Sequence, residues 1–124
     1  MIILTNNPDV KEAFSDRDLC FLDGSYRDML IRARDLVHQG HRLLTHPLMG
    51  SLKPNETPYR TIVLSKTAGS LDLESLELIE NAIGTFEKFA KVTRPDRGAN
   101  TPEHMLADFR LIDLSLVRSA LSQQ

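Results

Sequence analysis

Short runs of aliphatic and β-branched residues alternate along this chain with segments of helical periodicity. A continuous apolar run at 2–5 precedes an Asn-Pro helix start at 7–8, and a second run at 19–22 precedes a helical pattern at 26–37. Continuous apolar runs of this length are typical of strands that are covered on both faces. The alternation therefore predicts an α/β fold, built as a three-layer αβα sandwich.

Two further runs complete the predicted sheet. The run at 42–45 is short, whereas the run at 61–65 is rich in β-branched residues. The four runs predict a small, mostly parallel, four-stranded sheet of Rossmann-like type. The direction of the fourth strand stays open because no crossover helix precedes it. Two helical segments follow, one capped by Ser70 and one starting at 101–102, and they predict a C-terminal helical hairpin.

The last helical segment is apolar on more than one stripe. A helix of this kind must be covered on two sides, either by the sheet and a neighbouring helix or by another subunit. We therefore expect that a homodimer could form through the C-terminal helices.

Composition excludes several classes of protein. The chain has 124 residues with 15 Lys and Arg against 17 Asp and Glu, a net charge of −2, which is unlike a nucleic-acid-binding protein. No apolar run is long enough for a membrane span or a signal peptide. The single cysteine, Cys20, cannot form an internal disulfide, as is usual in a reducing compartment. We expect one domain over residues 1–124, cytoplasmic, with neither nucleic acid nor membrane as partner.

Polar residues follow the predicted strands at the points where the strands end. In sheets of this type, ligands bind beyond the carboxyl ends of the strands. Two of these segments also enter helices, whose amino ends favour anions. For Asn7 and Ser25, ordinary helix capping is the favoured interpretation, and ligand binding is the alternative that stays open. The candidate ligand-binding residues here are Asn6, Asn7, Ser25, Thr45 and His46.

The segment at 46–58 has neither helical nor alternating periodicity and contains three prolines. Loops of this length in compact domains are usually functional or mobile. Its side chains offer a cation, a carboxylate, an amide and hydroxyls, which suit a zwitterionic or phosphorylated small molecule. The alternative is a solvated surface loop. The candidates are Ser51, Lys53, Asn55, Glu56 and Thr57.

Enzymatic activity is a weaker interpretation. His46 is the histidine whose position best suits acid–base chemistry, with Glu56 as a second such group and Lys53 as an electrostatic stabiliser. No glycine-rich nucleotide motif is present, and no cofactor is expected. No nucleophile elbow is present either, so a Ser-His-acid triad is unsupported. The spacing of His41, His46 and Glu56 matches no recognised metal site, and no metal is expected.

Several segments resemble the GrdX family. They are TNNP at 5–8, DGSY at 23–26, THPLMGSLKPNETPYRTIVLSK at 45–66 and DFRLIDLSLV at 108–117. The family takes its name from genes in bacterial glycine reductase clusters, so the resemblance implies a context in amino-acid reduction rather than a mechanism.

Two main hypotheses follow. The first is a small-molecule or anion-binding accessory to glycine, betaine or sarcosine reductase metabolism. The second is a protein-interaction or chaperone-like partner of the reductase components.

Overall fold

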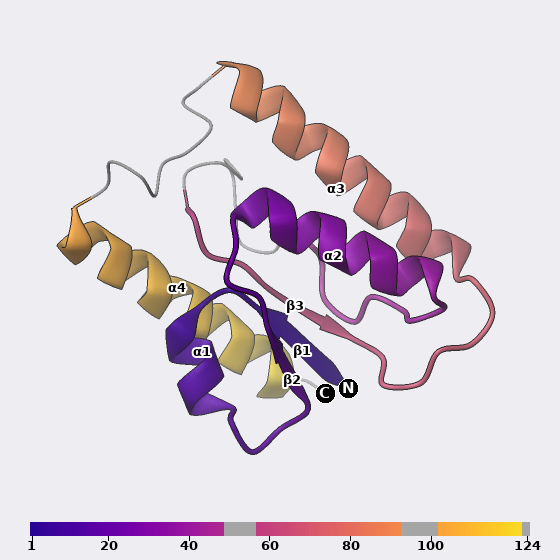
Figure 1. Ribbon diagram of the computed structural model, residues 1–124, viewed down its shortest axis with the longest axis horizontal. Coiled ribbons are helices and arrows are strands. Elements are labelled where there is room, and N and C mark those ends of the chain that lie inside the picture. Colours follow the sequence, from indigo (N-terminus) through magenta and orange to yellow (C-terminus); the bar gives the residue numbers. More distant parts are fainter. Residues whose placement is uncertain (49–56, 93–101, 123–124) are drawn as a thin grey trace.

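The computed structural model describes residues 1–48, 57–92 and 102–122 of the chain (Figure 1). They form a mixed α/β structure, as the alternation of strand and helix patterns predicts. Its elements in chain order are β1 (Ile2–Thr5), α1 (Pro8–Ala13), β2 (Leu19–Phe21), α2 (Tyr26–His38), β3 (Thr61–Leu64), α3 (Leu73–Val92) and α4 (Glu103–Ser122).

The sheet formed by the described residues has three strands in the order β2-β1-β3. β1 pairs with β2 in parallel and with β3 antiparallel, and Thr5 lies between Phe21 and Thr61 in the register. The predicted four-stranded, mostly parallel, Rossmann-like sheet is therefore not confirmed. The carboxyl ends of β1 and β2 share one edge of the sheet with the amino end of β3, and this edge is called the carboxyl edge below.

The segment at 42–45, predicted as a strand, forms only an isolated antiparallel bridge between Leu43 and Leu64. Two main-chain hydrogen bonds flank this bridge, from Leu44 N to Val63 O (2.8 Å) and from Ser65 N to the carbonyl of residue 42 (2.8 Å). The next amide, Val63 N, donates to the Thr45 side chain (Oγ1, 3.1 Å). Because a side chain takes this hydrogen bond, the pairing does not extend into a strand.

The two faces of the sheet carry different helices. Because side chains alternate along a strand, Leu4, Ile62 and Leu64 point to the face covered by α2 and α3. Ile3 and Val63 point to the opposite face, covered by α1 and α4. The three layers of helix, sheet and helix are visible in Figure 1.

The C-terminal helices do not form the predicted hairpin. α3 packs against α2, whereas α4 packs against α1, so the two helices lie on opposite faces of the sheet (Figure 1). The reason is that α1 has only six residues and contributes one buried side chain, Val10. α4 supplies Val117 and completes the cover of that face. None of the described helices is long and apolar enough to cross a membrane.

Local signals explain where the helices begin and end. Asn7 caps α1 in front of Pro8, and a capping box between Ser25 and Asp28 starts α2. Gly40 ends α2 with a φ of 106°, where a Cβ would lie 2.0 Å from the carbonyl oxygen of Gly69. α3 is capped by the carboxylate of Asp72, which accepts from Ser75 N (3.1 Å), so the expected cap at Ser70 is wrong.

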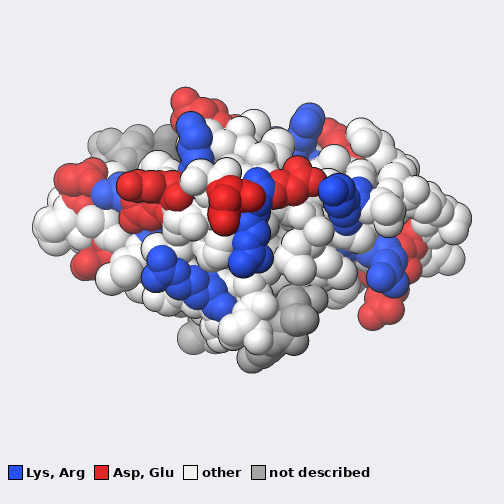
Figure 2. Space-filling view, turned by 90° about the horizontal axis from the view of Figure 1, so that it is seen from below, with Lys and Arg blue, Asp and Glu red and all other residues white. Residues whose placement is uncertain are grey.

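Side chains of both charges are interspersed on the face of the molecule shown in Figure 2. Basic and acidic side chains of the described residues lie side by side there. This face therefore presents no single sign of charge to a partner.

Candidate functional site

The buried polar side chains of the described residues gather at the carboxyl edge. Seven polar or charged side chains in the described part of the chain are buried, and Ser75 is the only one of these seven outside this edge. Burying such groups lowers stability unless hydrogen bonds replace water. The six residues at the edge are Thr5, Asn6, Asn7, Arg60, Thr61 and Asp113.

On the α2 side of the sheet, Asn6 joins three segments of the chain. Its Nδ2 donates to the carbonyls of Gly24 (3.0 Å) and Pro58 (2.9 Å). Its Oδ1 accepts from Arg60 N (2.8 Å). Two of the three strand-end segments that the sequence predicts to gather at one edge, 5–7 and 24–26, thus meet here, together with residues 58–60. In the third segment, Thr45 instead accepts a hydrogen bond from Val63 N.

Arg60 is a buried cation on this same side. Its side chain is 2% exposed, and its guanidinium carbon lies 5.2 Å from the centre of the Tyr26 ring. Tyr26 in turn stacks on Phe86, with ring centroids 5.1 Å apart. The aromatic face compensates part of the cost of burying the charge.

On the α4 side, a directed chain of hydrogen bonds ends at Asp113. Thr61 Oγ1 donates to Asp113 Oδ2 (2.7 Å), so its single proton is committed there. Thr5 Oγ1, which lies 2.7 Å from Thr61 Oγ1, must then be the donor in that pair. Thr5 Oγ1 itself accepts from Asn7 N (3.0 Å).

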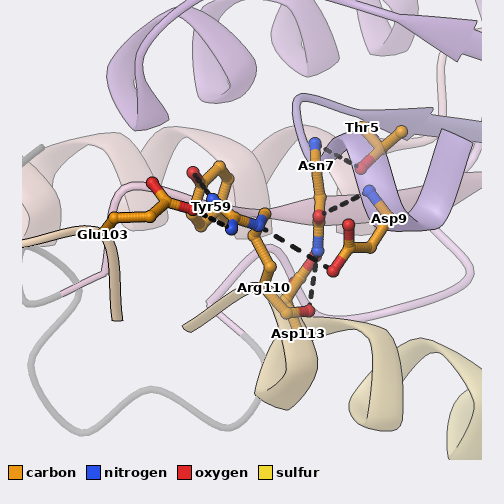
Figure 3. A network of polar contacts seen from close by, with 7 residues as sticks. All are labelled: Thr5, Asn7, Asp9, Tyr59, Glu103, Arg110 and Asp113. Atoms are coloured by element: carbon orange, nitrogen blue, oxygen red, sulfur yellow. Dashed lines mark hydrogen bonds and ion pairs between the residues drawn. The ribbon is translucent and has the colours of Figure 1, made fainter. Parts of the chain in front are cut away.

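Asn7 contributes twice to this network (Figure 3). Its Nδ2 donates to Asp113 Oδ2 (3.0 Å) and to the carbonyl of Arg110 (2.9 Å). Its Oδ1 accepts from Asp9 N (3.0 Å), which is the capping interaction of α1. Asn7 therefore caps α1 and also attaches α4 to the end of β1.

The two carboxylate oxygens of Asp113 differ in their hydrogen bonds. Oδ2 accepts two hydrogen bonds, from Thr61 and Asn7. Oδ1 is buried and has no hydrogen-bond partner among the described residues, although the residue is only 3% exposed. A buried carboxylate oxygen without a donor destabilises a fold and needs a specific explanation.

Arg110 lies at the outer side of the network, between Tyr59 and Glu103 on one side and Asn7 and Asp9 on the other (Figure 3). Its guanidinium donates to the Tyr59 hydroxyl (Nη1, 2.9 Å) and to the carboxylate of Glu103 (Nη2). Its Nε lies 3.8 Å from Asp9 Oδ2. The hydrogen bonds to Glu103 and Tyr59 raise the pKa of Arg110 above its ordinary value, so the group stays cationic.

The remaining predicted residues have local roles. Ser25 Oγ accepts from Asp28 N (3.1 Å) in the capping box, which satisfies the amino end of α2. Thr45 Oγ1 accepts from Val63 N, and Thr57 Oγ1 accepts from Tyr59 N (3.2 Å). The exposed His46 accepts from Leu48 N at Nδ1 (3.0 Å). The other predicted loop residues, Ser51, Lys53, Asn55 and Glu56, lie outside the described residues.

Sequence reasoning missed Arg60, Asp113, Arg110 and Tyr59. One signal was present for Asp113, because it is an acidic residue four positions before Val117 on the apolar stripe of its helix. Arg60 directly precedes the β-branched run of β3, and it packs against Tyr26 of another element. Among the described residues, no three His, Cys, Asp or Glu side chains come together so as to hold a metal ion.

Fold and site together define a layered α/β protein with a buried polar cluster at the carboxyl edge of its sheet. Searches among curated proteins and among solved structures returned no match. A family model, described as GrdX-like protein, matches residues 2–122. The chain belongs to this family.

Proposed function

We propose that the protein binds a small anionic or zwitterionic molecule at the carboxyl edge, as an accessory to glycine, betaine or sarcosine reductase metabolism. The observation that carries this proposal is the gathering of buried polar groups there, including the charges of Arg60 and Asp113. An interior selected for stability alone gains little from two such charges on opposite faces of a sheet. Functional sites are one place where proteins keep such groups in spite of their cost.

Arg60 is the group best suited to an anion. Its guanidinium can bind a carboxylate or phosphate through two parallel hydrogen bonds. The neighbouring Asn6 is held by three hydrogen bonds, which would keep the site in place before a ligand arrives. The reductase context comes from the family resemblance and is part of the proposal.

A thermal-shift series tests ligand binding. Glycine, sarcosine, betaine, acetate and inorganic phosphate would be added separately to the purified protein. A ligand present at 100 times its Kd stabilises the folded state by about 2.7 kcal/mol, or roughly 10 °C in Tm for a chain of this size. If none of the five compounds raises the Tm, ligand binding of this class is refuted.

Two further measurements locate the site. Arg60→Gln should weaken binding of the anion at least tenfold, whereas Arg42→Gln, which removes an exposed arginine beside β3, should not. Backbone amide shifts in the wild-type protein should change at 5–7, 24–26 and 58–61 on titration. Shifts confined to other regions would contradict this location even if Arg60→Gln does not fold.

A second candidate function is favoured by α4. Leu111 and Ile112 are exposed by 59% and 56%, although both are large and apolar. Such residues on a helix suit a protein interface, either with reductase components or with a second copy of this chain. Pull-down with purified reductase components and sedimentation of the protein alone test the two partners. The double variant Leu111→Glu, Ile112→Glu should abolish whichever association is found.

A further inference from the structure

We propose that Asp113 recognises a protonated primary or secondary amine, with Oδ1 as the acceptor of an N–H group. This inference rests on the proposed function and adds a second recognition group at the carboxyl edge, one for an amine. It concerns the α4 side of the carboxyl edge, whereas Arg60 lies on the α2 side.

Hydrogen-bond accounting leaves one acceptor open. Thr61 and Asn7 both donate to Oδ2, and they hold the carboxylate in a fixed orientation. Oδ1 is out of contact with water and has no donor among the described residues. A donor that also carries positive charge would satisfy the open acceptor and compensate the buried negative charge in one contact.

The surrounding charge favours a cation. Asp113, Asp9 and Glu103 carry three negative charges in the network of Figure 3, against the single positive charge of Arg110, which leaves an excess of two negative charges. An excess of negative charge attracts an ammonium group and repels a free anion. The site also differs from a metal site, because no cluster of three ligating side chains exists among the described residues.

Arg110 is the side chain that would move to admit the amine. It lies one helical turn before Asp113 on α4 and covers the outer side of the network (Figure 3). Of its ionic partners, Glu103 is largely exposed and Asp9 is partly exposed, so solvent screens both ion pairs and they are easily exchanged. The donors to Oδ2 come from β3 and from the turn before α1, and they would stay in place while Arg110 moves.

A series of compounds that differ only at nitrogen tests the proposal. Glycine and sarcosine carry N–H groups, betaine is a zwitterion whose quaternary ammonium has no N–H group, and acetate has no nitrogen. We expect glycine and sarcosine to bind at least tenfold more tightly than betaine and acetate, as measured by calorimetric titration. Asp113→Asn should abolish this preference, because it removes the charge while keeping the shape. Asp108→Asn, which removes an exposed carboxylate from the same helix, should preserve it.

A measurement on the wild-type protein keeps the proposal testable if Asp113→Asn does not fold. The side-chain carboxyl ¹³C signal of Asp113 should shift on titration with methylammonium, and the signal of Asp108 should not. An unmoved Asp113 signal, or betaine and acetate binding as tightly as glycine, would overturn the amine site and leave the proposed function standing. If no compound binds at all, the proposed function fails as well.

Discussion

The two faces of the sheet use the same strands for different purposes. The face under α2 and α3 buries a cluster of twelve residues that includes the Tyr26–Phe86 stack. Among the described residues, the face under α1 and α4 has a cluster of four buried residues, and beside it lies a carboxylate with one oxygen that has no hydrogen-bond partner in that part of the chain. The difference indicates that the first face supplies most of the stability. The second face carries a group whose burial costs stability, which is expected of a functional residue.

The largest expected effect tests the stabilising role of the α2–α3 face. Leu30→Ala should lower the free energy of unfolding by about 3 kcal/mol, because Leu30 is wholly buried in the large cluster. Leu114→Ala, at a partly buried position against the small cluster, should cost roughly 1 kcal/mol. Urea denaturation of both variants measures the difference. Equal losses would remove the contrast between the faces.

A smaller loss of stability is expected when Asp113 loses the hydrogen bond from the Thr61 hydroxyl. Thr61→Val keeps the shape of the side chain but removes its hydrogen bond to Oδ2, and it also leaves Thr5 without an acceptor. The free energy of unfolding should fall by about 2 kcal/mol, as for other hydrogen bonds to a buried charged group. Thermal unfolding checks this value. An unchanged Tm would mean that the network contributes nothing to the attachment of α4.

Asp113→Asn is expected to raise the stability of the fold rather than lower it. The variant keeps an oxygen to accept from Thr61 and Asn7 and removes the buried charge. The free energy of unfolding should rise by about 1 kcal/mol, because the desolvation of the carboxylate is relieved. Chemical denaturation at neutral pH measures it. A large loss of stability instead would indicate that the charge holds α4 in place rather than serving a ligand.

The smallest expected effect is a change in the pKa of Asp72 when Ser75 is replaced. Ser75 is the residue outside the carboxyl edge among the buried polar residues that the structure describes. Its hydroxyl donates to Asp72 Oδ2 (2.6 Å) and accepts from Leu43 N (3.0 Å), so unlike Asp113 it is fully engaged. The hydrogen bond from Ser75 lowers the pKa of Asp72 below its ordinary value of 3.8. Ser75→Ala should therefore raise the pKa of Asp72, which an NMR pH titration follows.

The sign of the pH dependence follows from this lowered pKa. The ionised carboxylate of Asp72 stabilises the folded state above pH 3.8, and this contribution is lost as the pH falls through the lower pKa of the folded state. The wild-type protein should lose it at a lower pH than Ser75→Ala does. An Asp72 titration that is the same in both proteins would contradict the role of Ser75.

Much of the fold could be predicted because its signals are local. The apolar runs at 2–5 and 61–65, the Asn7-Pro8 start and the Ser25–Asp28 capping box depend on neighbouring residues alone, and each appears in the structure. The prediction of a strand at 42–45 was wrong because strand formation depends on the pairing partner. Here the Thr45 side chain accepts the hydrogen bond from Val63 N that would have extended the pairing. The prediction of a hairpin between α3 and α4 was wrong, because adjacency in sequence does not decide which face of a sheet a helix covers.

The candidate site was predictable only in part. Asn6 and Asn7 directly follow a strand. They are predicted by the rule that ligands bind beyond the carboxyl ends of the strands in sheets of this type. Arg60 has no local signature of burial, and Asp113 has only its place on the apolar stripe of its helix. Both make their buried contacts with elements distant in sequence.

The sequence by itself determined that this chain forms a layered α/β fold, where most of its strands and helices begin and end, and that it belongs to the GrdX-like family. These properties follow from periodicity, capping and local composition. Only the tertiary structure decided that α4 crosses to the face opposite α3 and brings Asp113 to Thr61 and Asn7. The physical reason is that the burial of a charge depends on which surfaces meet across the sheet, and that is set by packing between distant segments.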